Sequence, residues 1–226
     1  GSRVMPAEEA MRTVVVLSGG PPDVDGAARA WVAAASPQFV VAADAGAHLA
    51  ALLDLRVDVL VGDMDSLQPD HLAAAERSGA QVLHYPTDKD ATDLELALDV
   101  AVTESPTRIL VVGSGSGRLD HLLGSVAVLA SERWAAMQVD AQLGGTRLHV
   151  VRGRRFFDGT PGETVSLLAH GGPATGVTTE GLRWALSDAT LRAGSGLGVS
   201  NELVDPTAVV DVADGCVIVV RPGSTS

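Results

Sequence analysis

The sequence is poor in features that mark disulfide-bonded, secreted or membrane-spanning proteins. Cys216 is the single cysteine among 226 residues, so the chain cannot form an intrachain disulfide. It lies in an apolar run, where we expect it to be buried as a small hydrophobic residue. No apolar stretch approaches the about 18–20 residues that a membrane-spanning helix needs. Because the N-terminus also lacks a charged start followed by an apolar core, we expect a cytoplasmic protein.

Aromatic and basic residues are also scarce. Aromatic residues make up 3% of the chain, so Ala, Val and Leu must fill the core. The 16 Lys and Arg residues stand against 28 Asp and Glu residues, which gives a net charge of −12 with no Lys/Arg cluster. Such a chain repels nucleic acid and anionic membrane, so neither is an expected partner. The acidic balance suits Mg²⁺ and cationic ligands, although it can equally serve solubility.

The first 140 residues alternate short apolar runs with stretches that have helical spacing. The runs, which predict strands, are Thr13–Leu17, Phe39–Ala43, Val57–Val61, Gln81–His84, Arg108–Val112 and Met137–Asp140. The predicted helices between them are Val24–Ala35, Ala45–Leu53, Asp70–Ser78, Ala91–Thr103 and Leu119–Ala130. This alternation predicts an α/β fold, a parallel sheet with helices on both faces.

The pattern changes after about residue 142, where helix formers become rare and Gly and Pro separate short alternating segments. These segments are Arg147–Val151, Thr164–Leu168, Val177–Thr179, Thr190–Arg192, Ala208–Val212 and Val217–Val220. They predict a small antiparallel β-sandwich or barrel. We therefore expect two domains, an α/β domain over residues 1–142 and a β-sandwich domain over residues 143–226.

Ligands of a parallel sheet bind beyond the carboxyl ends of its strands, so the residues that follow each predicted strand are candidates. The first strand precedes Ser18–Pro22, whose small residues could let backbone N–H groups approach a phosphate or could form a plain tight turn. The second precedes Asp44, a carboxylate that taken alone is best explained as a helix N-cap.

The third strand is followed by Gly62–Leu67, which contains Asp63 and Asp65. Two carboxylates two residues apart raise each other's pKa unless a cation compensates them. A helix N-cap explains one of them and not both. Carboxylate oxygens are ligands of hard cations, so this pair favours a metal site over a structural role.

The segment after the fourth strand places Lys89, Asp90 and Asp93 at the start of the next helix. Either Asp90 or Thr92 could cap this helix. Asp93 would then fall in its first turn, where a carboxylate suits the helix dipole and could also face a metal. Lys89 is a candidate phosphate contact or a solvated surface lysine.

The fifth strand precedes Gly113–His121, where glycines and Arg118 stand at the start of a helix. Free N–H groups, the helix dipole and a guanidinium together can bind an anion. No Gly-Lys-Ser/Thr follows, so this is not a P-loop. His121 could transfer protons but is more simply a structural hydrogen-bond partner. Together, the successive strand ends predict a site for a polyphosphate substrate with Mg²⁺.

These segments resemble the thiamine pyrophosphokinase family, and the resemblance covers nearly the whole chain. The segment 43–67, with Asp44 and Gly62–Asp63–Met64–Asp65–Ser66 at its ends, is similar to the first signature of that family. KDATDLELAL (89–98) and GSGSGRLDH (113–121) resemble its second and third signatures. GLRWAL (181–186) and GVSNEL (198–203) resemble its last two, and all five occur in order.

The resemblance implies an ATP- and Mg²⁺-dependent homodimer in which the alcohol of thiamine attacks the β-phosphorus of ATP and AMP leaves. It implies that Asp63, Asp65 and Asp93 hold Mg²⁺ and orient the reacting groups. Arg118 and Asp120 would face the phosphates or the hydroxyl.

Further binding residues are also implied by the resemblance. Trp184 would cover the thiamine ring, which is a cation, with Ser200 and Asn201 nearby. The other binding residues are implied to be Asp44, Gly62, Lys89, Asp90, Gly115 and Gly117.

Several alternatives stay open at this point. Trp184 by itself is best explained as a sandwich-core residue, and Ala45 and Ser116 replace glycines that the family usually has. The side chain of Ser116 puts the path of the glycine loop in doubt. The same chemistry could serve another alcohol such as a hydroxymethylpterin, and the fold could instead serve a nucleotide-binding regulator or a metal-dependent phosphohydrolase. The two residue sets are separate in the sequence, so the site needs either a β domain that folds back over its own strand ends or an exchange between two subunits, and the resemblance favours a homodimer with shared sites.

Overall fold

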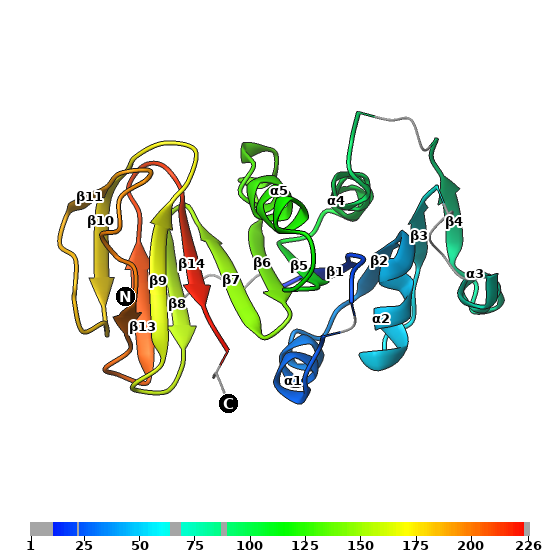
Figure 1. Cartoon of the computed structure of the whole chain (residues 1–226), viewed down its shortest axis with the longest axis horizontal. Helices are drawn as coiled ribbons and strands as arrows, with labels where there is room; N and C mark the ends of the chain where they lie inside the picture. The colour runs from blue at the N-terminus through cyan, green and yellow to red at the C-terminus, as the bar shows by residue number, and fades with distance from the viewer. Residues whose placement is uncertain (1–10, 22, 64–68, 87–89, 224–226) are drawn as a thin grey trace, which may run out of the picture.

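The computed structural model describes residues 11–21, 23–63, 69–86 and 90–223. Within them, the chain forms a ten-stranded sheet, a four-stranded sheet and helices that cover one half of the larger sheet on both faces (Figure 1). The α-helices are α1 (Gly26–Ala34), α2 (Ala47–Leu52), α3 (Pro69–Arg77), α4 (Asp93–Thr103) and α5 (Leu119–Leu129). Two 3₁₀ turns, η1 (Asp44–Gly46) and η2 (Glu132–Trp134), follow β2 and α5. No helix in this part of the chain is long and apolar enough to cross a bilayer.

One half of the large sheet is parallel. Its strands lie in the order β4-β3-β2-β1-β5-β6. Their bounds are β1 (Thr13–Leu17), β2 (Phe39–Ala43), β3 (Val59–Gly62), β4 (Gln81–His84), β5 (Arg108–Gly113) and β6 (Gln138–Leu143). The chain runs from β1 outward to β4 and then crosses back to β5, so the strand order reverses between β1 and β5. A crevice is expected at such a switch point.

Alternation of apolar side chains explains why both faces of this sheet carry helices. On β1, Val14 and Val16 face a core shared with α4 and α5, whereas Val15 and Leu17 face a core shared with α1 and α2. All four side chains are fully buried. Strands buried on both faces read as continuous apolar runs, which is why β1, β2 and β5 were predictable from the sequence.

The other half of the large sheet is antiparallel and continues directly from β6. Its strands are β7 (Thr146–Val151), β14 (Val217–Arg221), β9 (Thr164–Ala169) and β12 (Asn201–Glu202). The second sheet contains β8 (Arg154–Asp158), β13 (Thr207–Asp211), β10 (Ala174–Glu180) and β11 (Ala189–Leu191). A separate apolar core fills this β-sandwich. The predicted α/β fold followed by a β-sandwich is thus confirmed. Cys216 is buried, as expected from its place in an apolar run.

The division at residues 142/143 stays a prediction, because one continuous sheet passes through this point. Leu143 ends β6, and a turn at Gly144 and Gly145 leads into β7, which pairs with β6 in antiparallel register. The two halves therefore share backbone hydrogen bonds rather than a flexible linker.

A buried polar cluster also joins the two halves. The Asp140 carboxylate on β6 pairs with Arg108 on β5 (2.8 Å) and Arg155 on β8 (2.9 Å). It also contacts His149 Nδ1 on β7 at 2.8 Å. The guanidinium of Arg108 lies 5.4 Å from the ring centroid of Trp31 on α1. The sequence showed no basic cluster because these residues come from separate strands.

Candidate active site

A cavity of about 680 Å³ opens at the carboxyl ends of the parallel strands. It lies where the strand order reverses between β1 and β5, and the N-terminal turn of α4 and one side of α5 along most of its length form its other walls. The predicted site residues among those that line it are Asp44, Asp93, Gly117, Arg118 and Asp120. The structure thus gathers, around one cavity, predicted site residues that follow three different strands, β2, β4 and β5.

Close backbone packing shapes the wall between the loops after β1 and β5. Gly20 has φ +128°, and a Cβ at this position would lie 2.6 Å from the Cβ of Ser114. Gly113 leaves 3.3 Å between such an atom and the Cβ of Ser18. Side chains at either glycine would push the two loops apart, so the Ser18–Pro21 segment does more than form a turn: it lines the cavity.

Asp44 is one of the few buried carboxylates, with 6% of its surface exposed. It occupies a left-handed backbone conformation (φ +41°) at the start of η1. Its carboxylate rests against the next strand end, because a Cβ on Gly62 would lie 1.8 Å from Asp44 Oδ1. The explanation of Asp44 as a helix N-cap is wrong, since Gly46 precedes α2 and no side chain caps it. Gly62 is therefore required where the ends of β2 and β3 meet.

Asp63 follows β3 directly and is half-buried, whereas Asp65 lies outside the described residues. The described residues contain no group of three or more His, Cys, Asp or Glu side chains that could hold a metal ion. Asp63 and Asp93 nonetheless come from adjoining elements, since α4 packs against β2 and β3. The three-carboxylate metal site therefore stays a prediction.

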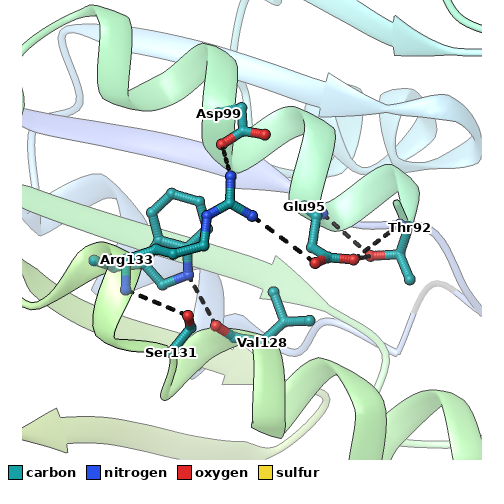
Figure 2. A network of polar contacts seen from close by, with 7 residues as sticks. Thr92, Glu95, Asp99, Val128, Ser131 and Arg133 are labelled. Carbon is teal, nitrogen blue, oxygen red and sulfur yellow. Dashed lines mark hydrogen bonds and ion pairs between the residues drawn. The ribbon is translucent and has the colours of Figure 1, made fainter. Parts of the chain in front are cut away.

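The start of α4 is fixed by a capping box that Figure 2 shows in detail. Thr92 accepts a hydrogen bond from the Glu95 N–H, and the Glu95 carboxylate accepts one from the Thr92 N–H at 2.9 Å. Thr92 is therefore the N-cap, and Asp93 begins the helix as predicted. Arg133 pairs with Asp99, and its Nη1 lies 3.9 Å from Glu95 Oε1, which ties α4 to η2, the turn that follows α5.

Of the two other predicted residues of this segment, Asp90 belongs to the described part of the chain and is not among the residues that line the cavity. Asp90 is exposed and precedes the capping box. Lys89 lies outside the described residues. Their roles as binding residues stay predictions.

The loop after β5 is held by a carboxylate that sequence reasoning missed. Asp23 Oδ2 accepts a hydrogen bond from the Gly115 N–H at 3.1 Å and from the Ser114 hydroxyl at 3.2 Å. Because the Gly115 N–H donates to Asp23, this amide does not donate to a phosphate in the same conformation. Gly115 can contribute to phosphate binding only through the backbone conformation that it gives the loop. Asp23 follows Pro21 and Pro22 with no motif around it, and only the fold brings it to Ser114.

Ser116 does not disturb this loop. It lines the cavity without a positive φ, and its N–H donates to the Ser114 hydroxyl at 3.0 Å. Gly117, with φ +99°, supplies the left-handed turn before α5. Ala45 likewise has no positive φ, so neither departure from the family pattern demands a glycine here.

Arg118 and Asp120 form an exposed pair at the start of α5. Arg118 Nε lies 3.1 Å from Asp120 Oδ1, and Arg118 Nη2 lies 2.6 Å from Asp120 Oδ2. The hydrogen bond from Arg118 lowers the pKa of Asp120, and the bond to Asp120 raises the pKa of Arg118. Both groups are therefore charged and line the cavity, beside His121.

Trp184, Ser200 and Asn201 lie in the β-sandwich and do not line this cavity. Trp184 is 59% exposed, so its explanation as a sandwich-core residue is wrong. Asn201 is buried and holds the Trp184 backbone from both sides: its Oδ1 accepts from the Trp184 N–H (3.1 Å) and its Nδ2 donates to the Trp184 carbonyl (2.9 Å). Ser200 is exposed, and its N–H donates to the Ser166 hydroxyl at 3.0 Å.

Two family models match this chain. The model described as thiamin pyrophosphokinase, catalytic domain, matches residues 30–140, and the model described as thiamin pyrophosphokinase, vitamin B1 binding domain, matches residues 147–217. The first covers the helix-flanked strands, and the second covers most of the β-sandwich.

Similar proteins of the same description occur in plants and bacteria. Thiamine pyrophosphokinase 1 of Oryza sativa subsp. japonica is 30% identical over 66% of this chain, and the match spans 60% of the rice protein. Thiamine pyrophosphokinase of Bacillus subtilis is 27% identical over 93% of this chain and 99% of its own length.

Solved structures resemble the chain over nearly its whole length. The crystal structure of the Bacillus subtilis enzyme covers 95% of this chain with all of its own, at a TM-score of 0.81 and 21% identity. That of thiamin pyrophosphokinase from Geobacillus thermodenitrificans covers 95% of this chain with 99% of its own, at a TM-score of 0.77 and 25% identity.

Proposed function

The chain belongs to the thiamine pyrophosphokinase family, and on this basis we propose that it transfers the pyrophosphoryl group of ATP to the hydroxyl of thiamine. The products are thiamine diphosphate and AMP. The observation that carries the proposal is the cavity at the switch point, where Asp44, Asp93 and the Arg118–Asp120 pair meet two glycine-rich loops. Such a wall offers cationic and amide donors to phosphate oxygens and carboxylates to a metal.

In the proposed reaction, the thiamine hydroxyl oxygen forms a bond to the β-phosphorus. The bond between that phosphorus and the oxygen shared with the α-phosphate breaks, AMP leaves with this oxygen, and the hydroxyl proton is released. The protein mainly positions the groups and neutralises charge, as is usual for transfers of this kind. Arg118 faces the phosphates in this proposal, and Asp120 holds the guanidinium in place through two hydrogen bonds.

Mg²⁺ is the proposed metal, held by Asp63, Asp65 and Asp93. Carboxylate oxygens are the donors that this ion prefers, and Asp63 and Asp93 stand at the same edge of the sheet on elements that pack together. When bound, the ion neutralises charge on the phosphates. The proposed location of the protein is the cytoplasm.

Thiamine is the proposed acceptor because Trp184 presents an exposed ring. A cation over an indole face gains about 0.5–2 kcal/mol, and the thiazolium ring of thiamine is a cation. Asn201 keeps Trp184 in place through its backbone. A neutral hydroxymethylpterin would gain nothing from this contact.

We further propose that the site is shared between the subunits of a homodimer. The phosphate side lies beside β5, whereas Asn201 lies on β12, five strands away in the same sheet. At about 4.8 Å per strand, the two sides of one chain are roughly 24 Å apart. A two-fold dimer can bring Trp184 of one subunit to the cavity of the other.

Apolar side chains exposed on both sides support this arrangement. Leu119 and Leu123, one turn apart on α5, are 68% and 61% exposed, and Leu197 and Val199 are exposed beside Ser200. Exposed apolar patches of this kind mark interaction surfaces.

Measuring AMP release with two acceptor alcohols tests the function. The protein is incubated with ATP and Mg²⁺ and with thiamine, with a hydroxymethylpterin or with no acceptor. We expect AMP to form only when thiamine is present, in an amount that matches the thiamine consumed. AMP with the pterin would identify the other acceptor, whereas phosphate released without acceptor would identify a hydrolase. The absence of turnover with nucleotide still bound would identify a regulator.

A further inference from the structure

Asp23 is the carboxylate that joins the two loops of the phosphate side. It lies between β1 and α1, and its Oδ2 accepts from the Gly115 N–H (3.1 Å) and from the Ser114 hydroxyl (3.2 Å). Ser114 lines the cavity. The loops after β1 and β5 are thereby joined by two hydrogen bonds that share one acceptor, Asp23 Oδ2.

A third chain segment packs against this oxygen. Gly144, in the turn after β6, has φ +55°, and a Cβ at this position would lie 2.8 Å from Asp23 Oδ2. A Cβ on Gly115 would lie 2.5 Å from the Leu143 carbonyl oxygen. Because both glycines leave no room for a side chain, the carboxylate occupies a fixed place between three loops.

Ser114, which Asp23 holds, also hydrogen-bonds to Ser116, in the part of the loop that lines the cavity. Ser114 Oγ accepts a hydrogen bond from the Ser116 N–H at 3.0 Å and lies 3.1 Å from Ser116 Oγ. Ser116 lines the cavity and is followed by Gly117 and Arg118. Fixing Ser114 therefore fixes the residues that lead into α5.

The charge of Asp23 excludes a direct role in binding phosphate. A carboxylate and a phosphate repel each other, and at short range inside a protein this repulsion is stronger than in water. Asp23 is not required as a helix cap either, since Asp25 caps α1 by accepting from the Ala28 N–H at 2.7 Å. The contacts of Asp23 thus indicate that it fixes the conformation of the loop after β5.

We propose that Asp23 is a positioning residue that fixes the glycine loop 113–117 in the conformation that receives the polyphosphate of ATP. It acts through the Gly115 amide and the Ser114 hydroxyl. The proposal rests on the proposed function, because that function places the polyphosphate at this loop.

The test compares Asp23→Ala, Asp23→Asn and the control Asp25→Ala. Asp23→Ala removes the acceptor, Asp23→Asn keeps an acceptor oxygen without the charge, and Asp25→Ala removes the α1 cap without touching the loop. Binding of a non-hydrolysable ATP analogue with Mg²⁺ is measured by calorimetry. Amide hydrogen exchange of peptides covering 113–118 is measured by mass spectrometry, which needs no turnover.

We expect Asp23→Ala to weaken analogue binding by roughly tenfold, as loss of a hydrogen bond to a charged group would, and to speed exchange in the loop by at least about tenfold. For Asp23→Asn, both the affinity for the analogue and the exchange rate of the loop should stay within about threefold of wild type. Asp25→Ala should lower the melting temperature by about 2–4 °C and leave both unchanged. In turnover, Asp23→Ala should raise the KM for ATP and not that for thiamine.

Unchanged analogue binding and loop exchange in Asp23→Ala would overturn the proposal. If Asp23→Ala does not fold, Asp23→Asn decides: a tenfold loss of binding with unchanged loop exchange would show that the charge matters instead. Wild-type protein that binds the analogue but makes no thiamine diphosphate would refute the proposed function alone. Wild-type protein that does not bind the analogue would refute both.

Discussion

Arg118 shows how a residue can matter for catalysis and little for folding. Its side chain is 71% exposed, and its partner Asp120 is 63% exposed, so solvent screens their attraction. The same pair nevertheless lines the cavity next to the glycine loop. Its charge is therefore available to a ligand rather than being used by the fold.

We predict that Arg118→Ala lowers turnover at least about tenfold and leaves the melting temperature unchanged, because a charge-assisted contact to phosphate is lost. The matched control is Arg56→Ala, since Arg56 pairs with Asp58 at 2.8 Å with the same sequence spacing. Steady-state kinetics and thermal unfolding measure both effects. Equal turnover of the two variants would show that Arg118 is merely a surface charge.

The carboxylates of the predicted metal site give a second test at this scale. Asp63→Asn and Asp93→Asn should fold normally and lose turnover at least about a hundredfold at ordinary Mg²⁺, since each removes an anionic ligand. Asp70→Asn, which alters the first turn of α3 instead of α4, is the control. A magnesium titration of initial rates measures the effect. Full turnover of either folded variant would remove that residue from the metal site.

Strand and helix positions were predictable where the apolar pattern was strong. The buried strands β1 and β2 match their predicted bounds, because short apolar runs rich in Val between turn residues favour strands. The bounds of β4, whose side chains are only partly buried or exposed, match as well. Two strands were missed. β8 reads Arg-Arg-Phe-Phe-Asp without alternation, and β12 is two residues long after a glycine-rich stretch. Both gain their pairing from neighbours that are distant in sequence.

The residues of the candidate site likewise include some that the sequence predicts and some that it does not. Asp44, Asp93 and Arg118 could be predicted because each follows a recognisable strand, and strand ends share one edge of the sheet. Asp23 could not, because its partner Ser114 is 91 residues away along the chain. The resemblance places Asn201 near the thiamine ring, which stays a prediction, and the hydrogen bonds between its amide and the Trp184 backbone could not be predicted. Such contacts depend on tertiary packing that no local pattern encodes.

The Asp140 cluster links β5, β6, β7 and β8 and makes the protein sensitive to acid. Burial would raise the pKa of Asp140, but His149, Arg155 and Arg108 keep it well below its usual range. Burial lowers the pKa of His149 despite the Asp140 carboxylate beside it. In both cases the unfolded chain binds the proton more readily than the folded one.

We therefore predict that the free energy of unfolding falls as the pH drops, first below about 6.5 as unfolded His149 is protonated, and then below about 4 as unfolded Asp140 is protonated. In His149→Gln the first decrease should be smaller than in wild type. Urea unfolding at pH 8, 6, 5 and 4 measures both windows. A stability that rises between pH 7 and pH 5, or an identical slope in the variant, would contradict this assignment.

At the scale of the whole molecule, the two halves of the proposed site lie at separate places in one chain. The phosphate side surrounds β1 and β5, whereas Trp184 is hydrogen-bonded to Asn201 on β12, which lies beyond β7, β14 and β9 in the strand order. Figure 1 shows β7, β14 and β9 on the side of β6 that faces away from β1. The sheet runs continuously between the two places, and neither Trp184 nor Asn201 lines the cavity of its own chain. Sequence reasoning anticipated this separation, because the two residue sets fall in different regions.

Subunit exchange tests the shared site. Mixing Asp63→Asn with Trp184→Ala should restore about a quarter of wild-type activity, because random pairing makes half of the dimers mixed and one of their two sites is intact. Mixing Asp63→Asn with Asp93→Asn is the control and should restore nothing, since both lesions affect the same half. Proven exchange without activity, or full activity of a monomer, would contradict the shared site.

The fate of the β-phosphorus of ATP tests the central claim most directly. The protein is incubated with Mg²⁺, thiamine and ATP labelled at the β-phosphate, and the products are separated and identified. Transfer of a pyrophosphoryl group predicts that the label appears in thiamine diphosphate, that AMP carries none, and that the two products form in equal amounts. Label that remains in ADP while thiamine gains a single phosphate, or label released without joining thiamine, would contradict the account.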